Sequence, residues 1–436
     1  MAEAALAARY RYYQHLDPRS TSIMRIPDHV LPATFFSILP FEEVGDKQPS
    51  IITIFSIWNT MLGTALLSMP WALEQAGFLL GLLILIVMAG VAFYTAYRVV
   101  QSPQGLKLKT CGVGRSLPHV CRYFWGKPGE IAGVFFSMVV LIGSKPLVRR
   151  EEAQRQCPNL VEVKLTVPPA PGDPRLPTHF QSPTIFTKFN GLGTISVAYL
   201  CIFVVIKAKE CGFHMDFSIP ATSKFHISLA EWKTFPALTG TLGLSYFIHN
   251  CILTILRSQK NPENNSRDLS IAFVLVASTY IFIAVTFFMF FPAPKSCIAD
   301  NFLNNYGTTD LLSAIARVFL LFQMLAVFPL LMYLIRAQLS WAILGNVFPG
   351  RKYVLLLNGF LVAICITFAI FLPTVGNILR FVGSFSGLVY MFALPCLVHM
   401  KRLREANRLS SLQIAVHSAI IFLGFANFFA QFTMLM

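Results

Sequence analysis

The fold of this chain is decided by the stretch Trp58-Asn59-Thr60-Met61-Leu62-Gly63-Thr64-Ala65-Leu66-Leu67-Ser68-Met69-Pro70-Trp71. It lies in an apolar run, residues 50 to 71, which is long enough to cross the roughly 30 Å core of a bilayer as a helix. The run also holds Asn, Thr, Gly and Ser, whose polar groups need partners inside the protein or in a watery cavity. Secondary transporters break helices at such stretches, where freed backbone groups bind an ion and a substrate carboxylate. The alternative is close helix packing through Gly63 and Thr64.

The composition is that of a membrane protein. Of the 436 residues, 55% are hydrophobic and 13% are charged, whereas about a quarter of a soluble globular chain is charged. A soluble enzyme, a secreted disulfide scaffold and a disordered tail are therefore excluded. Ten apolar runs are candidate spans: residues 50 to 71, 78 to 98, 130 to 144, 189 to 206, 236 to 256, 271 to 292, 311 to 335, 353 to 373, 378 to 399 and 411 to 435. We expect an all-α polytopic membrane protein, in which the run 130 to 144 is a truncated helix or no span.

A second run shows the same mixture of small and polar residues. Thr239-Gly240-Thr241-Leu242-Gly243-Leu244-Ser245-Tyr246 precedes Phe247-Ile248-His249-Asn250 within the run 236 to 256. Two interrupted helices in one chain are typical of inverted repeats, in which corresponding helices break beside the substrate. In the five-plus-five arrangement the second broken helix is the sixth, yet this run is the fifth candidate. One helix is therefore missing before it.

The basic residues lead to the same conclusion. Lys and Arg mark cytosolic loops, and sixteen of them lie in four loops, after the runs ending at 98, 256, 335 and 399. The first two of these loops are separated by three runs, although two cytosolic loops require an even number of crossings. Either the run 130 to 144 does not span, or a helix is missing between 145 and 188. Both solutions place the C-terminus on the non-cytosolic side.

Residues 145 to 188 differ from the rest of the chain. They hold eight prolines and seven Lys or Arg but no apolar run, which predicts a long irregular loop. The first 49 residues contain no secretory signal pattern, so we expect them in the cytosol. The sequence thus predicts a cytosolic partner-docking segment, 1 to 49, and a transmembrane domain, 50 to 436, with an atypical insertion at 145 to 188.

Several classes of function lack their motifs. Walker A, HExxH, GxSxG and kinase signatures are absent, so the sequence predicts neither an ATP-driven pump nor any enzyme. Lacking Asp or Glu deep in a run, the chain offers no acidic relay for a proton pump. The net charge of +15 is concentrated in the four basic loops, so it reports membrane topology and lipid contact rather than nucleic acid. Cys157 and Cys297 fall in loops expected outside the cytosol, where a disulfide can persist.

Several stretches together resemble the sodium-coupled neutral amino acid transporter family, in particular its lysosomal, arginine-sensing member. The first is the stretch from Trp58 to Trp71. The others are Tyr10-Arg11-Tyr12-Tyr13, Ile26-Pro27-Asp28-His29-Val30-Leu31-Pro32, Phe247-Ile248-His249-Asn250-Cys251-Ile252, Glu263-Asn264-Asn265-Ser266-Arg267-Asp268-Leu269 and Ile315-Ala316-Arg317-Val318-Phe319-Leu320-Leu321-Phe322-Gln323-Met324. The resemblance implies an eleven-helix LeuT-like bundle in the lysosomal membrane. It also implies sodium symport of amino acids such as arginine, leucine and glutamine, and signalling to the Ragulator–Rag GTPase complex.

The resemblance assigns roles to individual residues. The substrate site would be formed by backbone groups of Thr60, Met61, Leu62, Gly63 and Thr64, with Asn59 at the sodium site and no other cofactor. The Ragulator-binding segment would contain Tyr12, Tyr13, Ile26, Pro27, Asp28 and His29. Cys157 and Cys297 match the positions of a luminal disulfide in the family.

The chain departs from the family pattern in three places. The proline-rich stretch stands where the family has the end of its third helix, a luminal loop and its fourth helix. Ala326 stands where a Thr hydroxyl commonly faces sodium, and the N-terminal segment is shorter than the family's. Two alternatives to a signalling transporter therefore remain: a scaffold that binds amino acid without transporting it, and a splice or gene-model variant defective in transport.

Overall fold

The computed structural model describes residues 48–63, 65–103, 117–143, 184–216, 227–257, 259–307, 310–321, 338–340, single positions between 353 and 360, and 375–433. Within these ranges the regular structure is helical, apart from isolated bridges. The helices are α3 (Ser50–Leu62), α4 (Ala65–Ala76), α5 (Phe78–Gln101), α6 (Leu117–Gly143), α8 (Thr184–Cys211), α9 (Pro236–Ser245), α10 (Ile252–Arg257), α11 (Asn265–Phe290), α14 (Val375–Ser386), α15 (Leu394–Glu405) and α16 (Ser411–Thr433). A π-helical segment, η5 (Gly387–Ala393), joins α14 to α15, and a shorter apolar helix covers Leu311–Leu321. The short 3-10 helices are η2 (Pro262–Asn264), η3 (Lys295–Cys297) and η4 (Phe302–Asn305).

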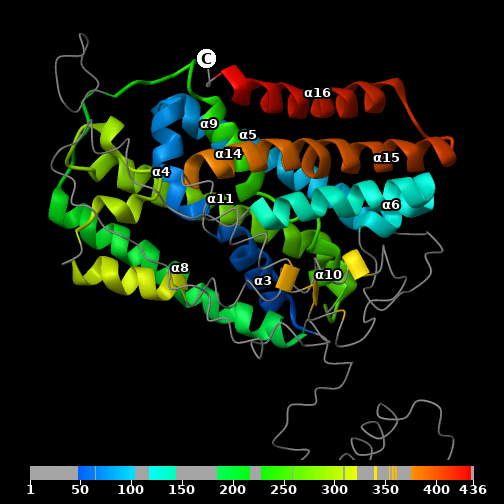
Figure 1. Ribbon diagram of the computed structural model, residues 1–436, viewed down its shortest axis with the longest axis horizontal. Helices are drawn as coiled ribbons and strands as arrows, with labels where there is room; N and C mark the ends of the chain where they lie inside the picture. Colours follow the sequence, from blue (N-terminus) through cyan, green and yellow to red (C-terminus); the bar gives the residue numbers. More distant parts are fainter. Residues whose placement is uncertain are drawn as a thin grey trace, which may run out of the picture. The chain divides into compact units, whose positions relative to one another are not determined.

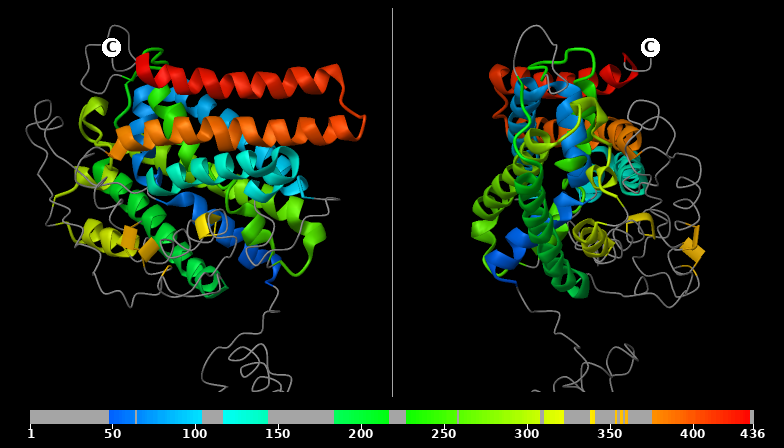
Figure 2. Two further views of the ribbon diagram at one scale, coloured as in Figure 1. Left: turned by 45° about the vertical axis from the view of Figure 1, so that its right-hand side comes forward. Right: turned by 90° about the vertical axis from the view of Figure 1, so that its left-hand side faces the viewer.

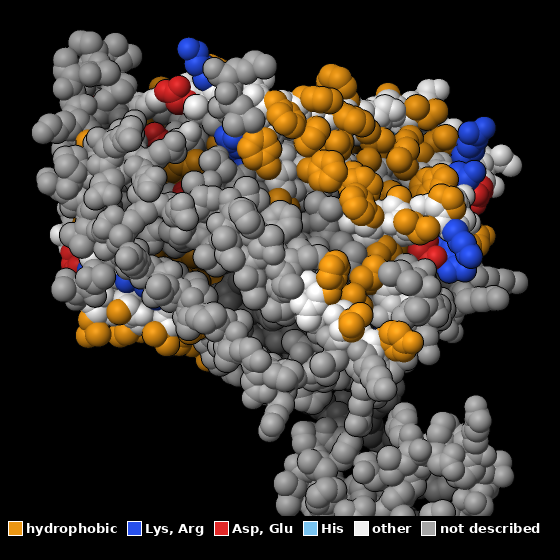
Figure 3. Space-filling model, viewed as in Figure 1, with side chains coloured by type: hydrophobic (Ala, Val, Ile, Leu, Met, Phe, Trp, Pro, Cys, Tyr) orange, Lys and Arg blue, Asp and Glu red, His pale blue; other side chains and the backbone are white. Residues whose placement is uncertain are grey.

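Several of these helices are long and apolar enough to cross a bilayer. In the part of the chain that the structure describes, four helices meet this criterion by themselves: Phe78–Gln101, Pro262–Phe290, Leu379–Glu405 and Ser411–Thr433. The bent pair α3 and α4 meets it when the two are taken together as one broken span. The outer face of α16 exposes large apolar side chains, among them Leu412 and Phe422, and Figure 3 shows hydrophobic side chains gathered over this region. Such a face suits lipid tails. The prediction of an all-α polytopic membrane protein is confirmed.

The two ends of the bundle are distinguished by charge. At one end, which we call the basic end, Arg402 of α15 donates a hydrogen bond to the carbonyl of Gln101 at the end of α5. The turn into α16 continues this end, and α15 and α16 lie side by side (Figure 1). At the opposite end the α4–α5 turn hydrogen-bonds the segment 228–231, and the His214 amide donates to the Met289 carbonyl of α11. The two ends therefore collect loops that are far apart in sequence.

The directions of α6 and α8 bear on the odd number of runs between the first two basic loops. The hydroxyl of Tyr390 donates to the Gly133 carbonyl, and Phe136, further along α6, meets Phe385, so α6 runs antiparallel to α14–α15. Both views of Figure 2 show α6 beside α15. The helix α8 also ends opposite the basic end, because His214, shortly after its last residue, donates from its amide to the Met289 carbonyl there. Two consecutive described helices thus point the same way, which corresponds to the odd number of runs between the first two basic loops.

The extent of α6 differs from the predicted run. It begins at Leu117, well before residue 130, and bends at Gly126, whose φ of 67° is open to glycine at little cost. The part after the bend is a helix as far as Gly143, and its truncation stays a prediction. Residues 144–183, where the atypical insertion was predicted, lie outside the described residues.

Candidate functional site

The first helix break lies inside the stretch from Trp58 to Trp71. The helix α3 ends at Leu62, Gly63 takes a non-helical conformation, and α4 starts at Ala65 with its axis bent by 57°. A Cβ added to Gly63 would meet nothing within 4 Å, so this glycine does not serve close helix packing. Pro70 inside α4 removes a further helical N–H donor. The local sequence itself therefore interrupts the span, as predicted, and Thr64 lies outside the described residues.

The second break falls a few residues later than the small residues indicated. The helix α9 continues to Ser245, the chain is non-helical over 246–251, and α10 starts at Ile252. Within the break, His249 is fully buried and its Nε2 lies 2.9 Å from the hydroxyl of Thr95 on α5. The neighbouring Asn250 is also buried, 3.5 Å from the Ser137 hydroxyl of α6. The break is thus enclosed by polar partners from other helices.

The glycines of α9 have a different role from the one that the sequence pattern indicated. A Cβ on Gly243 would lie 2.6 Å from the Gly383 carbonyl oxygen, and one on Gly240 would lie 2.7 Å from that of Arg380. Both glycines therefore allow α9 and α14 to touch backbone to backbone. They pack α9 and do not interrupt it.

A tyrosine of α11 joins the two breaks. The Tyr280 hydroxyl lies 2.7 Å from the Met61 carbonyl, in the last turn of α3, and 3.1 Å from the Ser245 carbonyl, at the end of α9. Carbonyls in the last turn of a helix have no intrahelical donor, so a single shared O–H serves both helix ends. Tyr280 is fully buried, and its ring meets the ring of Tyr246 edge to face at 5.5 Å. The arrangement ties both broken helices to α11.

Asn59 and its neighbours form the wall beside this junction. Asn59 is fully buried, and its side-chain amide fills the space in which a Cβ of Gly193 on α8 would lie. Trp58 donates from Nε1 to the Thr279 hydroxyl at 3.1 Å, next to Tyr280. The structure therefore brings Met61 and Ser245 together at one buried point, and Asn59 packs against α8. The Thr60 hydroxyl donates to the Ser56 carbonyl of its own helix.

We tested whether these residues fit sodium. The oxygen donors that meet between the breaks are the Met61 and Ser245 carbonyls, and the Tyr280 hydroxyl already donates to both. Among the described residues no cluster of three or more His, Cys, Asp or Glu side chains offers a metal site. Ala326 lies outside the described residues. The Tyr280 hydroxyl thus already lies between the two carbonyl oxygens, at the position that an ion bridging the two helix ends would take.

A larger cavity lies at the end opposite the basic end. It measures about 330 Å³ and is bordered by the α4–α5 turn, the segment 227–234 and the start of η3. Glu74, Glu231 and Lys295 contribute charge to its wall. The Lys295 ammonium donates to the Phe288 carbonyl at 2.7 Å, and its burial lowers its pKa to about 8. The size suits a small solute.

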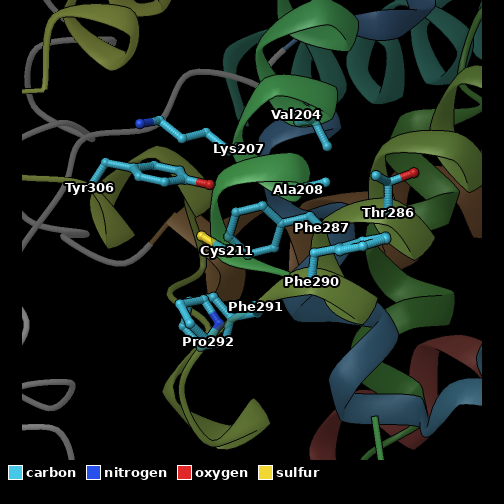
Figure 4. A pocket seen from close by; sticks show the side chains of 10 residues that line it. All are labelled: Val204, Lys207, Ala208, Cys211, Thr286, Phe287, Phe290, Phe291, Pro292 and Tyr306. Atoms are coloured by element: carbon cyan, nitrogen blue, oxygen red, sulfur yellow. The ribbon is translucent and has the colours of Figure 1, made fainter. Parts of the chain in front are cut away.

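A second hollow at the same end has no room for a substrate. It measures about 10 Å³, enough for a water molecule at most. Figure 4 shows the rings of Phe287, Phe290 and Tyr306 around it, with Lys207 at its edge. It is a packing defect between α8 and α11.

Two assignments, the Ragulator-binding residues and the Cys157–Cys297 pair, remain predictions. The six N-terminal residues expected to contact Ragulator, Tyr12, Tyr13, Ile26, Pro27, Asp28 and His29, lie outside the described residues. Cys297 is disulfide-bonded, while the other described cysteines are free thiols. Cys157 lies outside the described residues, so its pairing with Cys297 is still a prediction.

Sequence reasoning missed Tyr280. The signal was present, because a phenol in the middle of the apolar run 271 to 292 must find a hydrogen-bond partner away from water. Its partners, however, lie 219 and 35 positions away along the chain. Only the packing of α3, α9 and α11 brings them together.

Two interrupted helices whose ends meet at a buried point are typical of secondary transporters with an inverted-repeat helical bundle. The chain belongs to the family described as transmembrane amino acid transporter protein, whose model matches residues 49–145 and 176–436. It is therefore a multi-pass membrane transporter of the LeuT-fold class and not an enzyme. The match leaves out residues 146–175, which fall within the proline-rich stretch.

Similar proteins extend along nearly the whole chain. It is 46% identical to the sodium-coupled neutral amino acid transporter 9 homolog of Caenorhabditis elegans, over 98% of this chain and 80% of that protein. It is 38% identical to neutral amino acid transporter 9 of Xenopus tropicalis, over 99% of this chain and 90% of that protein. The protein of the same name from Rattus norvegicus is 36% identical, over 99% of this chain and 89% of that protein.

Proposed function

We propose that this chain moves neutral amino acids and arginine across the lysosomal membrane. The observation that carries the proposal is the meeting of two helix breaks at one buried point, joined through Tyr280. The names of the similar proteins from worm, frog and rat support neutral amino acids as substrates. Arginine, leucine, glutamine and the lysosomal location rest on the family resemblance.

In this proposal the substrate is bound by backbone groups of the first break. The residues are Thr60, Met61, Leu62, Gly63 and Thr64, with Asn59 beside them. The bend of 57° at Gly63 leaves the first N–H groups of α4 without helical acceptors, and such a helix N-terminus attracts a carboxylate. The cavity of about 330 Å³ provides a waiting site on the side opposite the basic end. The basic end faces the cytosol, because it carries Lys401, Arg402, Arg404 and Arg408.

Transport is tested with the purified full chain in proteoliposomes. Uptake of labelled leucine, arginine and glutamine should exceed that of protein-free vesicles and fall when unlabelled substrate competes. Uptake equal to that of protein-free vesicles for all three would refute transport. The Gly90→Ala variant should take up substrate like the unaltered chain, since a Cβ at Gly90 would meet nothing within 4 Å, and it serves as the control for substitution itself.

We further propose that the N-terminal segment signals by binding the Ragulator–Rag GTPase complex. The support is the likeness of Tyr12-Tyr13 and Ile26-Pro27-Asp28-His29 to the family's docking motif. Full-length chain carrying Tyr13→Ala or Ile26→Ala should retain less of the purified complex on an affinity resin than the unaltered chain. Equal retention would contradict the assignment.

One observation favours a second function, that of a scaffold without transport. The helices α6 and α8 point the same way, and the family match omits residues 146–175 between them. A chain of this kind would bind amino acid, measured by thermal stabilisation, and show no uptake. Sequencing the transcript across residues 140 to 190 decides whether the stretch is expressed as written or comes from a splice or gene-model variant.

A further inference from the structure

The junction of the two helix breaks poses a problem of charge. The Met61 and Ser245 carbonyls belong to the C-terminal ends of α3 and α9, which carry partial negative charge. Two such ends meet at Tyr280, which is fully buried. In broken-helix transporters carbonyls of this type coordinate a cation. Some positive group must therefore compensate them here.

The compensating group is already part of the chain. The Tyr280 hydroxyl directs its O–H dipole between the two carbonyls, at 2.7 Å from one and 3.1 Å from the other. A neutral donor costs far less to bury than an ion, which must shed its water. Its position is set by packing, because the ring contacts Tyr246 and the preceding Thr279 accepts a hydrogen bond from Trp58. The helix α11 thus holds the hydroxyl at a fixed place.

We propose that Tyr280 takes the place of the coupling sodium at this junction, so that the chain moves its amino acid without sodium there. The inference rests on the proposed transport function and deepens it, because it names the group that joins the two half-helices. Tyr280 is a positioning residue: it acts on the substrate site through the Met61 carbonyl. Asn59, assigned to sodium by resemblance, then serves packing against Gly193.

The first experiment measures stability and needs no transport. Purified full-length chain is melted in detergent at about 150 mM sodium chloride or choline chloride, which keeps ionic screening equal. The unaltered chain should melt at the same temperature in both salts. Tyr280→Phe should melt lower in choline and regain part of the loss in sodium, because removal of the hydroxyl exposes both carbonyls to an ion.

The matched control is Tyr390→Phe. Tyr390 is also fully buried and its hydroxyl also donates to a backbone carbonyl, that of Gly133, at 2.6 Å. This variant should melt lower in both salts to the same extent. Sodium stabilisation of the unaltered chain, or equal melting of Tyr280→Phe in both salts, would overturn the proposal. If Tyr280→Phe does not fold, the comparison of salts with the unaltered chain decides the question alone.

The second experiment measures uptake in the same two salts. Proteoliposomes containing the unaltered chain should take up labelled leucine at rates that agree within about twofold between sodium and choline. A loss of tenfold or more in choline would overturn the inference while supporting transport. Uptake absent in both salts would refute transport, and the melting experiment would still decide whether Tyr280 replaces the ion.

Discussion

Substitution of Gly243 by alanine tests the packing that positions the second break. A Cβ at this position would lie 2.6 Å from the Gly383 carbonyl oxygen and 3.0 Å from its carbonyl carbon. Ordinary contacts between such atoms are about 3.5 Å, so α9 and α14 would have to separate by about 1 Å. Both neighbours are backbone atoms that cannot rotate away. We therefore expect the backbones to move.

The magnitude follows from two opposing terms. Overpacking of a close contact costs about 1–3 kcal/mol, and alanine in place of glycine in a helix returns about 1 kcal/mol. Gly243→Ala should thus destabilise the chain by up to about 2 kcal/mol and lower its melting midpoint by about 1–2 °C, because a chain of this length has a large unfolding entropy. The shift would also carry the Ser245 carbonyl away from Tyr280, so leucine uptake should fall with the midpoint.

The assay compares melting midpoints of the purified chain and two glycine variants. Gly90→Ala is the control, because a Cβ at Gly90 in α5 meets nothing within 4 Å. That variant should keep its midpoint or gain up to about 1 kcal/mol of helix propensity. If Gly243→Ala melts like Gly90→Ala, the close approach of α9 and α14 is wrong, and with it the account of how the second break is placed.

Three further predictions concern other parts of the chain. Burial lowers the pKa of Lys295 to about 8 from its ordinary 10.5. Between these pH values the unfolded chain holds the proton and the folded chain has lost it, so stability should rise with pH. Lys295→Met should remove that rise, and equal pH dependence of the melting midpoint in the variant and the unaltered chain would contradict the prediction. If Cys297 pairs with Cys157, the unreduced denatured chain should take up seven maleimides out of nine cysteines, and either single serine variant should take up eight. Six adducts in the Cys157→Ser variant would exclude the pair, because Cys297 would then be bonded to another cysteine. Gly193→Ala should displace the Asn59 amide and reduce leucine uptake several-fold, whereas uptake equal to that of the control glycine variant would show that this contact is dispensable.

The membrane fold was predictable because its causes are local. Apolar runs of about 20 residues are long enough to cross the bilayer, and the polar stretch around Gly63 predicted the break that lies between α3 and α4. The basic loops likewise showed an odd number of runs where an even number of crossings is required, and in the structure α6 and α8 point the same way. Composition and charge therefore determined the class of the protein.

The function of individual residues within the spans was not predictable in the same way. Gly240 and Gly243 look like helix-breaking residues in the sequence, yet α14 uses them as a contact surface and the break begins only at Tyr246. Glycine is found both at helix breaks and at close helix contacts, so the helix packed against it determines which of the two roles it has.

The sequence by itself determined that this chain crosses a membrane several times, and it predicted an interruption near Gly63. It left open whether the run 130 to 144 fails to span or a helix is missing before α8. The tertiary structure alone decided what lies between the two breaks. The Tyr280 hydroxyl reaches carbonyls 219 and 35 positions away, and no pattern of spacing encodes such a meeting. The physical reason is that a buried donor must be satisfied, but only the packed bundle determines which acceptors satisfy it.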